Sequence, residues 1–226
     1  MLALLVLVCS DPVAEPLPMV QAAALATLDE TLEPGSLIFS EGACLYVTAY
    51  TGSATTHVAI ADRDADGTVM IYDSMKGFGV RRSTLAHYLD DMNDATLRVL
   101  HPTKPLSDRA RARLHAALED DLGRPYSVAH YLTGRRATGV HCSEYATHSL
   151  REAGLVRCAH PANVSPGGLA KSLEAGVNWR SAGAIALVQP QPVKPEGLNC
   201  CEDFWWETGE CCRQTGDWLT GLFLCR

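Results

Sequence analysis

One short segment constrains the fold of this chain more than any other, Asp64-Ala65-Asp66-Gly67, which lies between two apolar runs. Asp-Gly readily adopts the positive φ angles of a tight turn, so the segment predicts a β-hairpin. The flanking runs, residues 57–61 and 68–73, contain the β-branched and aromatic residues that strands favour. The sequence therefore predicts two antiparallel strands joined near residues 64–67.

Apolar periodicity and turn residues place further elements around this hairpin. Additional strands are expected at residues 36–40, 44–50, 79–82, 96–100 and 184–188. Helices are expected at residues 20–32, 83–91, 106–122, 142 to about 154, and 169–175. Strands dominate the first half and helices follow later. This order predicts an α+β fold in which a small antiparallel sheet packs against helices.

Length and composition indicate a globular protein with a sizeable core. The chain has 226 residues, of which 47% are hydrophobic and 20% are charged. The net charge is −7 and no basic block is present, so nucleic acid is excluded as an expected partner. We expect three parts: a hydrophobic segment and spacer at 1–20, one domain at 21–188, and a Pro-rich linker with a Cys- and Trp-rich tail at 189–226.

Nine cysteines are spread unevenly, and five of them lie in the last 27 residues. A tail this dense in cysteine is typical of an oxidised, extracytoplasmic protein, although reduced or acylated thiols in a cytoplasmic protein are the alternative. The apolar run at residues 1–8 ends at Cys9, as in a secretory or lipoprotein signal. No Lys or Arg precedes that run, so a buried N-terminal strand is the alternative. We expect an extracytoplasmic location: periplasmic, secreted or anchored as a lipoprotein.

Two Cys-Cys pairs in the tail, at 200–201 and 211–212, are eleven residues apart and accompany several aromatic residues. Eleven residues make about three helical turns, so both pairs would share one face of a helix. Three structures fit this pattern: a disulfide-linked module, an interfacial membrane anchor carrying acyl groups, and a zinc cluster. A poorly ordered tail is the fourth alternative. Zinc is least favoured, because adjacent cysteines lack the usual two-residue gap.

Cys142 is the cysteine whose setting suits a nucleophile. It follows the loop at 138–140 and opens an expected helix, where the helix N-terminus stabilises a thiolate. Taken alone, such a residue is more often a buried structural cysteine. His57 opens an apolar strand after a small polar loop, and a hairpin centred near residue 65 pairs it with Asp73. Asp73 could then orient the imidazole, the role of a triad's third member, unless it is only a solvated strand end.

Five segments occur in an order that points to one family. They are Pro34-Gly35-Ser36-Leu37-Ile38-Phe39, Thr56-His57-Val58-Ala59-Ile60, Ile71-Tyr72-Asp73-Ser74, Leu122-Gly123-Arg124-Pro125-Tyr126 and His141-Cys142-Ser143-Glu144-Tyr145. Together they resemble the permuted papain-like (NlpC/P60-type) amidases of the YiiX/YaeF family. In that family the histidine precedes the cysteine along the chain, the reverse of the order in ordinary papain-like enzymes.

The resemblance implies a circularly permuted papain-like fold and assigns roles to individual residues. Cys142 matches the nucleophile, His57 the base, and Asp73 an acidic residue that is usually Glu in the family. Tyr126 matches a tyrosine near the nucleophile, with a role in substrate binding or in the oxyanion site. Ser36 replaces an Asp that commonly follows the glycine. No metal or cofactor is expected.

The implied chemistry is acyl transfer through a thioester on Cys142. We expect a cysteine amidase or peptidase that acts on a cell-wall-type peptide or another small amide. A lipid acyl hydrolase or acyltransferase is the alternative enzyme, and a non-catalytic binding module is the alternative from another class. The expected partners are a small amide, peptide or acyl substrate and a membrane contacted through the N-terminus or the tail. The oligomeric state is left open.

Overall fold

The computed structural model describes residues 15–42, 45–92, 95–134, 137–188 and 192–224. One mixed sheet forms its centre, with the strand order β1-β7-β6-β2-β3-β4-β5. The strands are β1 (Leu17–Val20), β2 (Leu37–Glu41), β3 (Thr55–Arg63), β4 (Val69–Met75), β5 (Gly79–Thr84), β6 (Thr96–Pro102) and β7 (Trp179–Val188). All neighbouring strands are antiparallel except β1, which runs parallel to β7.

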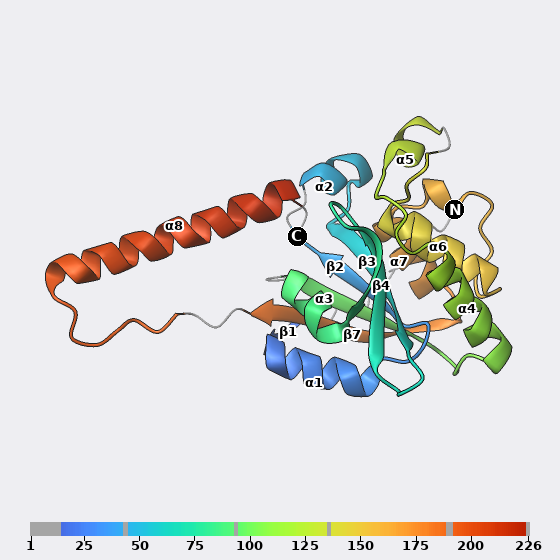
Figure 1. The fold of residues 1–226 in the computed structure, drawn as a ribbon, viewed down its shortest axis with the longest axis horizontal. Coiled ribbons are helices and arrows are strands. Elements are labelled where there is room, and N and C mark those ends of the chain that lie inside the picture. Colours follow the sequence, from blue (N-terminus) through green and yellow to red (C-terminus); the bar gives the residue numbers. More distant parts are fainter. Residues whose placement is uncertain (1–14, 43–44, 93–94, 135–136, 189–191, 225–226) are drawn as a thin grey trace, which may run out of the picture.

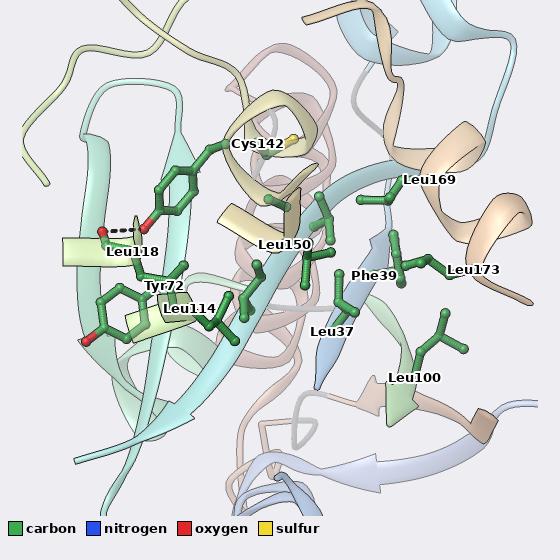
Figure 2. Packing of buried hydrophobic residues seen from close by; sticks show 14 of the residues in the cluster. Leu37, Phe39, Tyr72, Leu100, Leu114, Leu118, Cys142, Leu150, Leu169 and Leu173 are labelled. Carbon is green, nitrogen blue, oxygen red and sulfur yellow. Dashed lines mark hydrogen bonds between the residues drawn. The ribbon is translucent and has the colours of Figure 1, made fainter. Parts of the chain in front are cut away.

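Helices cover both faces of the sheet (Figure 1). They are α1 (Gln21–Thr31), α2 (Leu45–Thr51), α3 (Leu85–Asp91), α4 (Asp108–Asp120), α5 (Ala129–Thr133), α6 (Cys142–Glu152), α7 (Pro166–Glu174) and α8 (Cys200–Leu224), with a 3-10 turn η1 (Pro161–Asn163). Strand pleating divides the core in two, because successive side chains point to opposite faces. Leu37 and Phe39 of β2 pack with α4, α6 and α7 (Figure 2). Ile38 packs with α1 and α3 on the other face.

The hairpin between β3 and β4 forms where the sequence predicts it, and Gly67 has a φ of +83°. Its register differs by two residues from the predicted one, because Asp73 lies opposite Ala59 and not opposite His57. The reason is the loop, in which the Asp64 N–H bonds the Thr68 carbonyl and moves the turn centre towards the C-terminus. Because the register is shifted by an even number of residues, the side chains of His57 and Asp73 still lie on the same face of the sheet, as predicted.

Two stretches adopt a structure other than the one that the sequence analysis assigned to them. Residues 44–50 were expected to form a strand, but Leu45–Thr51 form α2, outside the sheet. A short apolar run cannot be assigned from its pattern alone, since four to seven such residues suit a strand and a helix equally. Leu17–Val20, expected to belong to a spacer, form β1 along β7. The apolar run at residues 1–8 and Cys9 lie outside the described residues.

Other element boundaries are close to the predicted ones. Ser107 caps α4 by accepting the Ala110 N–H. Helix α7 begins three residues earlier than predicted, because Ser165 caps it and Pro166 occupies its first turn. Strand β7 begins five residues earlier than the predicted strand, and its extra part is mostly exposed, so it carries no apolar signal.

The tail forms one 25-residue helix, α8, which extends beside the sheet domain with its C-terminal end near α2 (Figure 1). Cys200, Cys201, Cys211 and Cys212 are exposed free thiols on this helix. In the part of the chain that the structure describes, no helix is long and apolar enough to cross a bilayer. Among the described residues, these four cysteines form no disulfide.

Candidate active site

Cys142 is the first residue of α6 and is 3% exposed. The helix begins here because the preceding residue, His141, has extended backbone angles and caps it: the His141 Nδ1 accepts the Glu144 N–H at 3.3 Å. The first N–H groups of a helix have no intrahelical partner, and their dipoles favour a negative charge. Figure 2 shows Cys142 at the edge of the buried cluster beside the sheet. This confirms the predicted start of the helix at Cys142.

His57 and Asp73 meet across the neighbouring strands β3 and β4. The Nε2 atom of His57 lies 3.0 Å from Oδ2 of Asp73, a carboxylate that is fully buried. The guanidinium of Arg81 on β5 holds the same carboxylate, with its Nε 2.9 Å from Oδ1. Burial alone would raise the pKa of Asp73, but His57 and Arg81 outweigh it and hold that pKa below its usual range. Asp73 is therefore an ionised anchor for His57 and not a solvated strand end.

The thiol of Cys142 interacts electrostatically with two imidazoles. Burial disfavours the thiolate, but His141 and His57 outweigh that cost and lower the pKa of Cys142 to about 6. Burial also lowers the pKa of His57, whereas its hydrogen bond to Asp73 and the neighbouring Cys142 raise it to about 10. Between those two values the favoured state is a thiolate beside an imidazolium. The predicted residues Cys142, His57 and Asp73 are thus brought together in one site.

Three residues of the site were missed by the sequence analysis: Arg81, Tyr88 and His141. Arg81 lies directly opposite Asp73 on β5, a pairing that the glycines at 77 and 79 could have indicated as a second hairpin. Tyr88 of α3 is fully buried and stacks near the His57 ring, with 6.5 Å between the ring centroids. Nothing in the sequence pattern points to Tyr88, because its contact with His57 depends on how α3 packs on the sheet.

A small pocket with a cavity volume of about 30 Å³ opens beside Cys142. Its lining combines the site with α2, α5 and the start of α7, and comprises Val47, Thr51, Thr56, Tyr126, Val128, Tyr131, His141, Cys142, Ser165 and Pro166. Tyr126 lies here because it forms a parallel bridge with Val140, two residues before the nucleophile candidate. The sequence analysis expected Tyr126 near Cys142, and the structure places it in the same pocket.

Metal ligands are not gathered anywhere in the described residues, where no group of three or more His, Cys, Asp or Glu side chains could hold an ion. Glu144, which belongs to the Cys-Ser-Glu motif, directs Oε1 to Nδ1 of His130 at 3.1 Å. Its partner is therefore a histidine of α5, on the side of α6 where a separate polar cleft opens between α5, α6 and η1.

The comparison with known families decides between related folds. The sequence profile of the permuted papain-like amidase enzymes of the YaeF/YiiX type, the C92 family, matches residues 31–191. The chain belongs to this family. The match covers well over half of the sequence and confirms both the family suggested by the five motifs and the α+β, permuted papain-like fold. The C92 family is one of papain-like cysteine amidases and peptidases, so the chain is a hydrolase of that kind.

Among solved structures, a crystal structure of the metalloprotein yiiX from Escherichia coli O157:H7 is similar to this C92 family member. The two share 13% sequence identity with a TM-score of 0.47, over 71% of this chain and 99% of that one. None of the curated proteins matches this chain.

Proposed function

We propose that this enzyme hydrolyses an amide bond by nucleophilic attack of Cys142, with His57 as acid and base and Asp73 as the anchor of His57. One observation carries the proposal: a buried thiol at a helix N-terminus shares its site with an imidazole that an ionised, buried carboxylate holds. This is the arrangement that activates a cysteine nucleophile. The substrate is a peptide of the cell-wall type or another small amide.

The geometry supplies each step of the reaction. His57 uses Nε2 for Asp73, so Nδ1 is the ring nitrogen left for the thiol proton. The Cys142 thiolate bonds the carbonyl carbon, and the C=O π electrons move to oxygen. The Cys142 N–H, free of an intrahelical partner, donates to this oxyanion. The carbonyl reforms as the C–N bond breaks, and the His57 imidazolium gives its proton to the leaving nitrogen.

Hydrolysis of the thioester reverses the role of His57. The neutral imidazole takes a proton from water as the oxygen of that water attacks the thioester carbonyl. Collapse of the second tetrahedral intermediate breaks the C–S bond and releases the acid and the thiolate. Tyr126 lines the pocket at the reacting centre, and we assign it to substrate binding or to the oxyanion site.

A second candidate, hydrolysis or transfer of a lipid acyl group, is favoured by the lining of the pocket. Val47, Val128 and Pro166 supply aliphatic surface, and the ring of Tyr131 adds aromatic surface, all beside Cys142. Such a lining suits the acyl side of a substrate more than a charged peptide. The chemistry at Cys142 would be the same, with an ester oxygen as the leaving atom in place of nitrogen.

The test compares turnover of peptidoglycan-derived peptides and of short-chain acyl esters by three proteins: wild type, Cys142→Ala and Cys158→Ala. Loss of the nucleophile is expected to lower kcat on the order of 10³-fold or more, as in other enzymes of this type. Cys158 is a free, partly exposed thiol outside the pocket, so its variant is the matched control and should keep wild-type activity. Undiminished turnover by Cys142→Ala would refute the proposed function, and the preferred substrate series decides between amide and acyl chemistry.

A further inference from the structure

His141 directly precedes Cys142 in the sequence and is the second imidazole that interacts with its thiol. It is 4% exposed and lines the same pocket as the thiol. Its ring is held from three directions: Nε2 donates to the Ala162 carbonyl at 3.0 Å, Nδ1 caps α6, and the Tyr131 ring meets it edge-on at 5.6 Å. A ring fixed in this way keeps one orientation, so its charge state can change without a change of rotamer.

Two groups compete for the Nδ1 atom of His141, and they require opposite protonation states. The Glu144 N–H, at 3.3 Å, can only donate, so it requires an unprotonated Nδ1. The Ser143 Oγ lies closer, at 3.1 Å, and gives its own proton to the Val164 carbonyl at 2.6 Å. With that proton committed, Ser143 can only accept from His141. The contact between Ser143 and His141 becomes a hydrogen bond when Nδ1 carries a proton.

The charges around the ring decide which partner prevails. The α6 N-terminus disfavours a cation at His141, and so does the His57 imidazolium that shares the Cys142 thiolate. Against these two effects stand the Cys142 thiolate and Glu144, whose Oε2 lies 3.8 Å from Nε2 and has no hydrogen-bond partner of its own. The Tyr131 ring meets the His141 ring edge-on. Burial lowers the pKa of His141, but Cys142, Ala162 and Glu144 outweigh it and raise that pKa above its usual value.

We propose that His141 is a positioning residue for Cys142, which carries a proton on Nδ1 while Cys142 is a thiolate and gives it up when the thiolate is consumed. Ser143 accepts the Nδ1–H in the charged state, and the Glu144 N–H bonds Nδ1 in the neutral state. The proton exchanges with solvent and takes no part in bond cleavage, which remains the task of His57. The inference rests on the proposed function, because it concerns the thiolate on which that function depends.

The experiment measures alkylation of Cys142 by iodoacetamide as a function of pH, read from the Cys142 peptide by mass spectrometry. The key variant is His141→Asn, because the Asn side chain still accepts the Glu144 N–H as an N-cap but cannot carry a proton. We expect the alkylation midpoint to rise by about one pH unit, since the thiolate loses one of two cations. The midpoint is the readout because the intrinsic nucleophilicity of a thiolate also changes with its pKa.

A second variant removes the group that holds the charged form. Ser143→Ala should raise the midpoint in the same direction by a smaller amount, since the cap to Glu144 remains. Ser149→Ala is the matched control: Ser149 is buried in the same helix and also donates to a backbone carbonyl, that of Tyr145, but lies two turns from the site. Its midpoint should equal that of wild type. If His141→Asn does not fold, the contrast between Ser143→Ala and Ser149→Ala carries the test alone.

The outcomes separate this inference from the proposed function. A wild-type Cys142 that titrates as in the denatured chain would refute the activated thiol, and with it the proposed function. A lowered wild-type midpoint that neither His141→Asn nor Ser143→Ala raises would overturn the role of His141 and leave the proposed function intact.

Discussion

Asp73 is the residue that ties the charges of the site together. Its two oxygens are shared between His57 and Arg81, and Arg81 is itself held by Asp91 at 2.7 Å. An ion pair buried to this degree contributes only while all partners remain, because removing one leaves an uncompensated charge. The pKa of His57 therefore depends on the Asp73 carboxylate and on the Arg81 guanidinium that holds it.

Replacing Asp73 by Asn should change the pH dependence of kcat/KM as well as its size. In the wild type, activity should rise as Cys142 ionises near pH 6 and fall as His57 loses its proton near pH 10. The neutral Asn no longer stabilises the imidazolium, so the pKa of His57 falls and the alkaline limb moves to lower pH. We expect a loss of kcat/KM on the order of 10²–10⁴-fold, the range for removing a histidine's orienting carboxylate.

The matched control for that variant is Asp62→Asn. Asp62, on β3, is likewise a buried aspartate, and it pairs with a histidine, His115, at 2.9 Å. It lies outside the site. Its variant should keep both limbs of the wild-type profile. An alkaline limb in Asp73→Asn that coincides with that of the control would contradict the role given to Asp73.

Cys142, His57 and Asp73 could be predicted from the sequence, because their motifs occur in the order of the family. The hairpin between β3 and β4 also indicates that His57 and Asp73 lie on one face of the sheet. The same reasoning missed Arg81 and His141. Arg81 is recognisable only once the register of β4 and β5 is known. His141 is recognisable only from its hydrogen bonds to Ala162 and Ser143, which no spacing in the sequence predicts.

The segment before α6 positions the nucleophile through a close backbone approach. Val140 bonds the Pro125 carbonyl through its N–H at 3.0 Å, and its own carbonyl accepts the Ser74 hydroxyl at 2.8 Å. Gly139 allows this approach: a Cβ there would lie 2.4 Å from the Pro125 oxygen and 2.8 Å from Cβ of Ser127. Neither neighbour can yield easily, because the closer contact is to backbone.

Gly139→Ala should therefore separate the two backbone segments and move the start of α6. We expect a loss of about 1–3 kcal/mol in the free energy of unfolding, the range for overpacked sites, measured by denaturant titration. Alkylation of Cys142 should slow at neutral pH in the same variant, because the thiol shifts relative to His57.

Gly42→Ala is the control for the glycine change, since its added Cβ would only come within 3.8 Å of the Thr56 hydroxyl, an ordinary contact. Equal stability of the two variants would show that the approach at Gly139 does not position α6.

Elements were in general more predictable than their contacts. The helix at Cys142 and the hairpin follow from caps and turn residues, whereas α2 was mistaken for a strand because its short apolar run has no decisive period.

On the scale of the whole molecule, the sheet explains how a histidine early in the chain reaches a cysteine some 85 residues later. His57 and Asp73 lie on the neighbouring strands β3 and β4, near the β5 edge of the sheet, and α6, which packs against both strands, begins at Cys142. The motif order predicted this convergence through the family. The pocket could not be predicted, because it needs α2, α5 and the start of α7 to gather around the thiol.

Helix α8 gives the molecule a surface that the sheet domain does not use. Phe204 and Trp205 are 63% and 69% exposed, and both Cys-Cys pairs fall on the same side because they are eleven residues apart, about three turns. The other side carries carboxylates, at Asp203 and Glu210. An uncharged aromatic side opposite an acidic one suits a lipid interface without net negative charge, since acidic groups are repelled by anionic headgroups.

We therefore expect the full chain, kept reduced, to co-sediment with phosphatidylcholine vesicles and to bind less when phosphatidylglycerol is added. Changing both Phe204 and Trp205 to Ser should abolish the binding, because the pair supplies the exposed aromatic surface of α8. Glu210→Gln is the matched change on the opposite side, and it should preserve binding to neutral vesicles and lessen the penalty for anionic ones. Binding that grows with the anionic lipid fraction would contradict the charge argument. Concentration-dependent dimers in sedimentation, formed without any binding to vesicles, would assign the same side of α8 to a second copy of the chain.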